Sequence, residues 1–293
     1  KMRVKPAEQE SVDEDGLLID DAPGRSKKKP KRTYAADWRE PKLMTIFVHD
    51  ENGKMVKETK ATMDGTLLGP DAIAEIVAMH LQRLGAAEAL SVTFVADGAP
   101  WIWDRIDRII ELAGLEDVAT YQVLDCCHAV HHVSMALASL GLTRQERNPL
   151  YRDLRSRLRN GQWEQVIEVL SDLQNSDSPI AELETEIGYL RRHGEAGRLK
   201  YVRFRQLGIP CGSGAIESGI RRVLNLRLKS NAMFWTQDHA ESILQVRCQV
   251  IPDQWDAAMS DLQEFHRREA YDGWTWEPGN MSIKNENPPA LAT

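Results

Sequence analysis

An almost uninterrupted run of apolar residues, SVTFVA at positions 91–96, predicts a strand that is buried on both faces. Asp97 ends this strand, and Gly98 with Pro100 predicts a turn followed by a helix over residues 101–113. An acid at the carboxyl end of a buried strand lies where open α/β sheets hold their chemistry. Asp97 could equally cap the following helix through its side-chain oxygen.

The same patterns predict a meander of strands before this point. Residues 1–5 alternate apolar and basic side chains and are typical of a strand remnant. Residues 43–49 form a strong strand pattern, residues 50–53 are a hairpin turn, and residues 55–61 are predicted as the returning strand. Apolar spacing over residues 70–84 then predicts an amphipathic helix.

The second half of the chain is predominantly helical. A short strand over residues 120–124 ends at Asp125. Helices are then predicted at residues 126–140, 144–159, 163–173, 180–191, 215–228 and 236–250. Glycines in residues 209–214 mark a tight turn before the fifth of these helices, and the chain from Asp272 onward is predicted to be irregular.

This order predicts an α/β fold of the RNase H-like type. Its mixed sheet would have three antiparallel strands continued by parallel strands, with an all-helical insertion before the last catalytic helix. We expect a first part of this core at residues 1–128, in which the first strand is truncated and residues 6–37 form a flexible charged loop. The helical insertion would span 129–208, the last part of the core 209–252, and an acidic tail 253–293.

Charge is distributed unevenly along the chain, although the whole carries a formal net charge of −7. Residues 187–229 hold ten Lys or Arg against two acids, whereas residues 236–293 hold four against ten. The four cysteines show no disulfide framework, and no apolar run approaches the ~18 residues of a membrane span. These features predict a cytoplasmic protein with no membrane contact.

Three acids are candidates for chemistry. Asp97 and Asp125 each follow a predicted strand, and Glu217 lies in the first turn of a helix. Carboxylates that converge on one cleft bind Mg²⁺ or Mn²⁺, and a pair of such ions supports phosphodiester cleavage. The alternative for Glu217 is a favourable interaction with the helix dipole, worth only ~0.3–1 kcal/mol.

A cluster of cysteines and histidines follows Asp125. Cys127 with His131, and His128 with His132, are spaced to share a helix face and could bind zinc. No second Cys/His pair stands at zinc-finger spacing, so a buried small residue beside a hydrogen-bonded histidine is the commoner outcome.

Basic and aromatic residues near the candidate acids point to a polyanion. The predicted DNA contacts are Arg221, Arg222, Arg227, Lys229, Arg155, Arg159, Trp101 and Trp235. A solvated basic surface, with the tryptophans in the core, is the alternative reading of the same residues.

Four segments resemble DDE transposases of bacterial insertion sequences, in the RNase H-like group related to Mutator-type elements. They are WREPKL at 38–43, ADGAPWIW at 96–103, LDCCHAVHHV at 124–133 and CGSGAIESGIRRVLNLRLK at 211–229. The resemblance implies that Asp97 and Glu217 are the second and third acids of the catalytic triad and ligands of Mg²⁺ or Mn²⁺. It implies a supporting role for Asp125 and His128.

The resemblance also implies the reaction and its partners. The reaction would be cleavage and strand transfer of double-stranded DNA, at the element ends and at the target. The protein would be associated with the bacterial nucleoid. Whether it acts as a monomer or as a homodimer is left open. The family's first acid lies just ahead of residues like Met2–Val4, so we expect a truncated, inactive chain. A nuclease of the same fold, and a degenerate or domesticated fragment that only binds DNA or a partner, are the alternatives.

Overall fold

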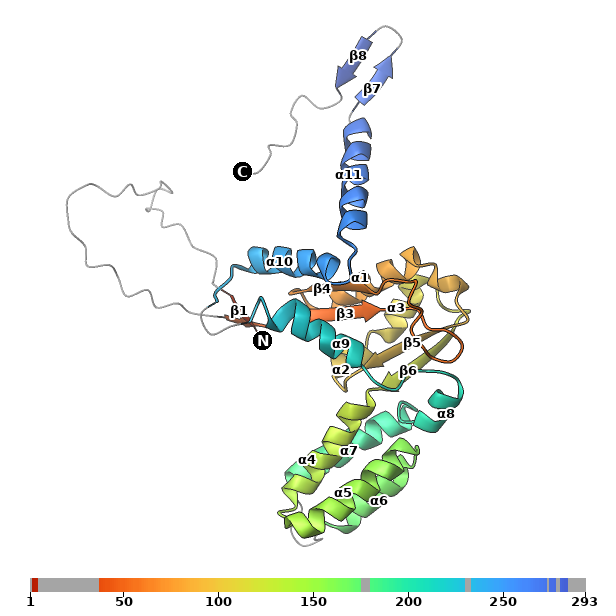
Figure 1. Cartoon of the computed structure of the whole chain (residues 1–293), viewed down its shortest axis with the longest axis vertical. Coiled ribbons are helices and arrows are strands. Elements are labelled where there is room, and N and C mark those ends of the chain that lie inside the picture. The colour runs from red at the N-terminus through yellow and green to blue at the C-terminus, as the bar shows by residue number, and fades with distance from the viewer. Residues whose placement is uncertain are drawn as a thin grey trace, which may run out of the picture.

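The computed structural model describes residues 2–4, 37–174, 180–229, 233–272, 274–277 and 280–283, and Figure 1 shows their arrangement. The expected loop at residues 6–37 lies almost wholly outside the described residues. The chain is α/β, with small sheets and a majority of helices. Its strands are β1 (Met2–Val4), β2 (Asp37–Arg39), β3 (Lys42–Ile46), β4 (Thr62–Thr66), β5 (Ser91–Ala96), β6 (Ala119–Leu124), β7 (Trp274–Glu277) and β8 (Asn280–Ile283).

The strands pair two by two. The pairs β1–β2 and β3–β4 are antiparallel, whereas β5 and β6 run parallel. The expected change from antiparallel to parallel pairing is therefore present, but the described strands form separate pairs instead of one continuous mixed sheet. Pro41 lies between β2 and β3 and has no N–H group to donate to a sheet, which favours an interruption there.

The turn at residues 50–53 is confirmed, but the returning strand is not where the sequence predicts it. Asp50 Oδ1 accepts the backbone N–H groups of Asn52 and Lys54, and Gly53 adopts a positive φ of 75°. Residues 55–61 contribute only one isolated bridge, between His49 and Met55. The return strand is β4, which is buried along its whole length and pairs with β3.

Two short helices stand where one was predicted after Asp97. Helix α1 (Pro70–Arg83) is as expected and is followed by the 3₁₀ turn η1 (Ala86–Glu88). Helix α2 (Pro100–Trp103) ends after one turn and α3 (Ile106–Ala113) continues the chain. Helix α3 packs against α1.

The predicted helical insertion is a four-helix bundle. It consists of α4 (Cys126–Ser139), α5 (Arg144–Arg159), α6 (Trp163–Asp172) and α7 (Ala181–Glu195). Each helix packs against two others of the set, in the order α4, α5, α6, α7 and back to α4. Thr143 begins α5 with a capping box that involves Glu146. A further short helix, α8 (Tyr201–Gln206), was not predicted.

The predicted helix over residues 215–228 changes its winding partway. Helix α9 (Gly214–Gly219) carries Glu217, and the π-helical segment η2 (Ile220–Asn225) continues it. The expected helix at 236–250 is α10 (Gln237–Val250), and the Thr236 hydroxyl caps it by accepting the N–H of His239.

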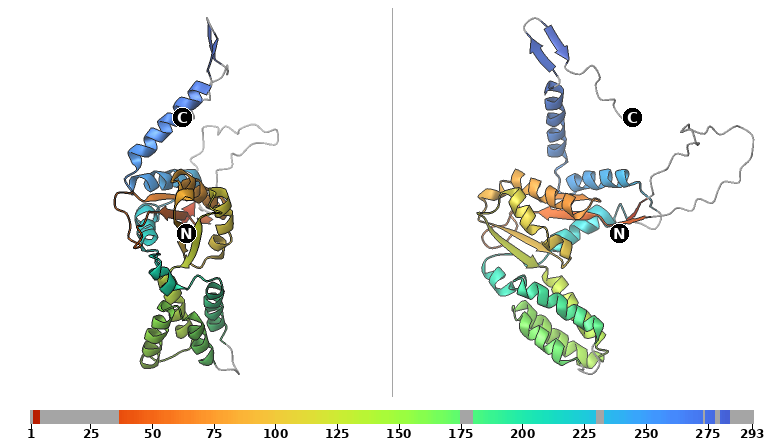
Figure 2. Two further views of the ribbon diagram at one scale, coloured as in Figure 1. Left: turned by 90° about the vertical axis from the view of Figure 1, so that its right-hand side faces the viewer. Right: turned by 180° about the vertical axis from the view of Figure 1, so that it is seen from behind.

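The C-terminal region is more regular than the sequence predicts. Helix α11 (Trp255–Asp272) stands away from the body of the molecule in all three views, and the β7–β8 hairpin lies at its far end (Figures 1 and 2). The prediction of an irregular chain from Asp272 is therefore wrong for residues 274–277 and 280–283.

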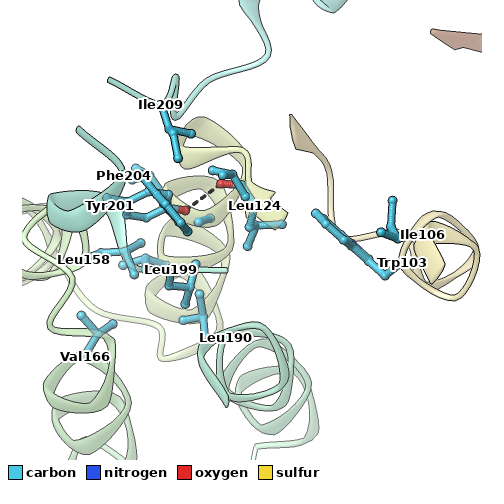
Figure 3. Close-up of a cluster of buried hydrophobic side chains, with 14 of the residues drawn as sticks. Trp103, Ile106, Leu124, Leu158, Val166, Leu190, Leu199, Tyr201, Phe204 and Ile209 are labelled. Atoms are coloured by element: carbon cyan, nitrogen blue, oxygen red, sulfur yellow. Dashed lines mark hydrogen bonds between the residues drawn. The ribbon is translucent and has the colours of Figure 1, made fainter. Parts of the chain in front are cut away.

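One large hydrophobic cluster joins the β5–β6 pair to the helical bundle. Figure 3 shows Leu124 at the end of β6 among side chains from both parts, with Trp103 beyond it. The buried Tyr201 hydroxyl donates to the Leu124 carbonyl at 3.0 Å. A second cluster packs α10 and η2 around Met63 and Leu67. Within the described part of the chain, no helix combines the length and apolarity needed to cross a membrane.

Candidate functional site

Asp97 lies directly after β5 and shapes the turn that follows. Its side chain is exposed, and its Oδ1 atom accepts the Ala99 N–H at 3.0 Å. Its carbonyl accepts the indole N–H of Trp103 at 2.9 Å. The turn that leaves the strand is therefore held from two sides, while the carboxylate faces solvent at the strand end.

Asp125 follows the neighbouring strand β6 and is buried. Its backbone N–H donates to the Ala96 carbonyl at 2.8 Å, which binds it to the residue before Asp97. Its Oδ1 atom accepts the N–H groups of Cys127 at 2.6 Å and His128 at 2.9 Å. Asp125 is thus the N-cap of α4, the first helix of the bundle.

The other carboxylate oxygen of Asp125 reaches the chain 88 residues later. Its Oδ2 atom accepts the Ser213 N–H at 2.5 Å and also the Ser213 hydroxyl. Burial opposes ionisation of Asp125, but the hydrogen bonds from Ser213, His128 and Cys127 outweigh burial and hold its pKa below the usual value. The Cys126 N–H reinforces the link by donating to the Cys211 carbonyl at 2.9 Å.

The helix that carries Glu217 starts next to Ser213, the residue that Asp125 binds. The Glu217 N–H donates to the Ser213 carbonyl at 3.1 Å, so the first turn of α9 starts at the residue that Asp125 holds. Gly219, two residues further, lies against Leu43 and Met63 of the β3–β4 pair. The Glu217 side chain is exposed, as that of Asp97 is, and the convergence of the two carboxylates on one metal ion stays a prediction.

One member of the Cys/His cluster, His132, packs against α7. His132 contacts Glu186 of α7 at 2.5 Å and stacks on the Tyr189 ring with centroids 3.5 Å apart. Burial raises the pKa of the neighbouring Cys126 thiol, and raises that of Cys211 to about 11, so both thiols are protonated at pH 7. Across the described residues, no group of three or more His, Cys, Asp or Glu is placed to hold a metal ion. A supporting role for the His128 side chain stays a prediction.

A contact between α7 and the Asp97 turn was missed by the sequence reasoning. A Cβ atom on Gly98 would lie 2.2 Å from the Tyr189 hydroxyl, so the ring packs directly on the backbone beside Asp97. The Tyr189 hydroxyl is buried and has no hydrogen-bond partner within the described part of the chain. Its pKa is raised, mainly by burial and then by the charge of Asp97.

His193 and Arg198 extend this contact. The His193 ring lies 4.7 Å from that of Tyr189 and 5.8 Å from that of Trp103, and the Arg198 guanidinium lies 4.1 Å from the Trp103 ring centre. Burial, followed by the nearby arginine charges, lowers the pKa of His193 to about 4. The imidazole is therefore neutral at pH 7. Only the aromatic content of these segments could have indicated the cluster from sequence.

The basic residues after Glu217 form a surface on η2 and the turn that follows. Arg221, Arg222, Arg227 and Lys229 are all exposed. Arg247 of α10 was not predicted, yet it donates to the carbonyls of Val223 and Arg222 and so holds η2 in place. Burial lowers the pKa of Arg247, and the positive charges of Arg227 and Arg222 lower it further, which places these three cations near one another.

Arg155 and Arg159 lie on α5 and are exposed. The Arg159 guanidinium interacts with the Cys126 thiol, and the Arg159 carbonyl accepts from the Arg205 side chain at 2.8 Å. The end of α5 therefore lies beside the start of α4, next to Asp125.

The two candidate tryptophans differ in their surroundings. Trp101 is half-buried and lies under the Lys42 ammonium, which is 5.4 Å from its ring centre. Trp235 packs against the second hydrophobic cluster, and its indole nitrogen is buried. Packing against the core takes up part of the ring that base stacking on Trp235 would need.

The sequence reasoning also missed a buried acid, Asp64 of β4. Its Oδ2 atom lies 2.7 Å from His80 Nε2 of α1, and its Oδ1 atom accepts the Gly65 N–H at 2.7 Å. Met63, the preceding residue, faces Gly219 near Glu217. Because neighbouring residues of a strand point to opposite faces, Asp64 lies on the face away from α9.

No protein-family model matches this chain, and no curated protein or solved structure matches it.

Proposed function

We propose that this chain carries part of a DDE transposase active site on an RNase H-like core. Asp97 and Glu217 would bind Mg²⁺ or Mn²⁺ for cleavage and strand transfer of DNA. The observation that carries the proposal is the Asp125 link, which joins the residue before Asp97 to the start of the Glu217 helix. The backbone and side chain of Asp125 thus connect the two segments that carry Asp97 and Glu217, 120 positions apart, and such a connection would serve two ligands of one ion.

In this proposal Asp97 and Glu217 bind the metal ion, and Asp125 positions them. Carboxylate oxygens suit a hard divalent cation, and Asp97 and Glu217 are exposed to receive one. Bound metal would activate the attacking water or hydroxyl and stabilise the leaving oxygen of the phosphodiester. Asp125, whose two oxygens are both engaged inside the protein, would position the two ligands without joining them.

The winding of the chain after Glu217 supports the same site. Single-turn π segments inside helices are frequent at functional sites, and η2 directly follows the turn that holds Glu217. Its arginines would place positive charge beside the metal ligands, where the DNA phosphates must approach. DNA binding at this surface would place the protein at the nucleoid.

The test is Mn²⁺ binding to the full chain, measured by electron paramagnetic resonance and calorimetry. Asp97→Asn and Glu217→Gln should each weaken Mn²⁺ at least about tenfold, because each removes one charged ligand. The matched control is Glu164→Gln, which changes an exposed acid in the first turn of α6 and should leave affinity unchanged.

Equal Mn²⁺ affinity in wild type and both variants would refute the metal site. If DNA binding nevertheless persists, the chain acts as a DNA-binding module without catalysis, which is the alternative function.

A further inference from the structure

The Tyr189 hydroxyl is a buried polar group that finds no hydrogen-bond partner among the described residues. A buried hydroxyl of this kind costs folding free energy, because it gives up its hydrogen bonds to water and gains none from the protein. Such groups are rare in native proteins, and those that occur include groups kept for binding or catalysis. Packing does not account for the hydroxyl, since a phenylalanine ring would fill the same space without it.

The ring of Tyr189 is held by its neighbours. One face stacks on the His132 ring of α4, with the ring centroids 3.5 Å apart, and the His193 ring lies 4.7 Å away. His132 is itself held by Glu186, whose carboxylate lies 2.5 Å from its Nδ1 atom. The hydroxyl lies on the long axis of the ring, so a ring that is held in place also holds the hydroxyl oxygen in place.

This oxygen lies against the turn that carries Asp97. A Cβ atom on Gly98 would be 2.2 Å from it, so the hydroxyl contacts the backbone of the residue that follows Asp97. Burial, and then the negative charge of Asp97, raises the pKa of Tyr189, so the hydroxyl keeps its proton at pH 7 and lies within electrostatic reach of the carboxylate. The Oδ1 atom of Asp97 accepts the Ala99 N–H. The second carboxylate oxygen, Oδ2, is the nearest charged acceptor for which the hydroxyl has a use.

We propose that the Tyr189 hydroxyl is a positioning group for Asp97, and that it donates a hydrogen bond to Asp97 Oδ2 when this carboxylate holds a divalent cation. The inference rests on the metal site proposed above. A carboxylate oxygen has two lone pairs, so Oδ2 can face an ion and accept from Tyr189 at the same time. Carboxylates that bind metals are themselves hydrogen-bonded, and loss of such a partner lowers metal affinity by about 10–100-fold.

The helical bundle thereby takes a direct part in the site. Tyr189 belongs to α7, whereas the Asp125 link works through the start of α4. The hydroxyl is unpaired in the metal-free protein and gains its partner with the ion. Ion binding should therefore raise the urea midpoint of unfolding more in wild type than in a variant without the hydroxyl, because a ligand stabilises the fold in proportion to its affinity.

Tyr189→Phe in the full chain tests the inference, because it removes the hydroxyl and keeps the ring. Without metal, the urea midpoint of this variant should equal or exceed that of wild type. Its Mn²⁺ affinity, measured by electron paramagnetic resonance, should nevertheless fall about tenfold. A residue that only packs would change stability and leave affinity unaltered. Tyr151→Phe is the matched control, since it removes a hydroxyl from α5 and should leave Mn²⁺ affinity unchanged.

A double-mutant cycle with Asp97→Asn assigns the effect to the carboxylate. In the Asp97→Asn background, Tyr189→Phe should have little further effect on Mn²⁺ affinity, because the charged ligand that the hydroxyl positions is absent. Equal and additive losses in the two backgrounds would show that Tyr189 acts elsewhere and would overturn the inference.

The remaining outcomes separate this inference from the metal site itself. If Asp97→Asn weakens Mn²⁺ binding and Tyr189→Phe does not, the metal site stands and the role of Tyr189 is refuted. If Asp97→Asn leaves Mn²⁺ affinity unchanged, the metal site fails and the inference fails with it. A lower urea midpoint of metal-free Tyr189→Phe would show that the hydroxyl already has a partner inside the protein, which also contradicts the inference.

Discussion

Asp125 shows how one buried side chain can join three parts of a protein. It ends β6, caps α4 and binds Ser213 ahead of α9, and its hydrogen-bond donors hold it in the charged form. Four donors converge on its two oxygens, from Cys127, His128 and both groups of Ser213. Such a carboxylate fixes geometry more firmly than an exposed acid can.

Asp125→Asn should destabilise the fold by about 2–4 kcal/mol, because the amide cannot accept at both positions and leaves buried donors unpaired. The measurement is the free energy of unfolding in urea at pH 7. Asp97→Asn, which alters an exposed acid with one turn hydrogen bond, should cost less than about 1 kcal/mol. Similar losses for both variants would contradict the role assigned to Asp125.

The free energy of unfolding should also depend on pH through the ionisation of Asp125. The folded pKa of Asp125 lies below its unfolded value, near 3.8, so its contribution is complete above that pH and is lost as the pH falls through the folded pKa. Asp125→Asn should remove this part of the acid sensitivity.

At the scale of elements, the bundle meets the α/β part where Tyr189 packs on Gly98. A Cβ atom at residue 98 would approach three atoms of the Tyr189 side chain to between 2.1 and 2.4 Å. The close approach of α7 to the Asp97 turn therefore depends on the missing side chain.

Gly98→Ala should destabilise the protein by about 2 kcal/mol or more through this clash. Tyr189→Leu should restore much of that loss in the double variant, because a shorter side chain makes room, and a double-mutant cycle of unfolding energies measures the coupling. Gly212→Ala is the control, since a Cβ atom there meets nothing within 4 Å. A coupling near zero would show that the two residues do not meet.

Local signals in the sequence identified most elements but not all of their partners. Pro70, Thr143 and Thr236 mark helix starts correctly, because Pro at a first position and side-chain caps act within one turn. Strand β4 was missed because Asp64 and Gly65 are poor strand formers. It is their burial under the surrounding helices that favours a strand at these residues. The hydrogen bonds between Asp125 and Ser213 join residues 88 positions apart, and no local sequence pattern predicts them.

At the scale of the whole molecule, the net charge of −7 conceals exposed basic residues in two regions. Arg221, Arg222, Arg227 and Lys229 lie on or just after η2, and Arg155 and Arg159 lie on α5. If about five of these cations neutralise phosphates, the log–log salt slope of DNA binding should be near −4 to −5.

Replacing Arg221 and Arg222 with Ala should flatten that slope by roughly two units and weaken any duplex equally, because phosphate contacts carry no sequence information. Salt titrations of wild type and double variant on two unrelated duplexes measure both effects. Arg267→Ala with Arg268→Ala removes the same charge from α11 and should leave the slope unchanged. If the Arg221→Ala, Arg222→Ala double variant keeps the wild-type slope, these arginines face solvent and do not contact DNA.

The bundle leaves and rejoins the α/β part at almost the same place. Leu124 N–H donates to the Arg198 carbonyl, and Cys126 N–H to the Cys211 carbonyl, so outgoing and returning chains are joined on both sides of Asp125. Everything between them is, in polymer terms, a closed loop whose ends are already fixed. The closure entropy of such a loop grows only logarithmically with its length. Residues could therefore be added or removed at the far end of the bundle, around the α4–α5 turn at residues 140–143, with little effect on where Glu217 lies.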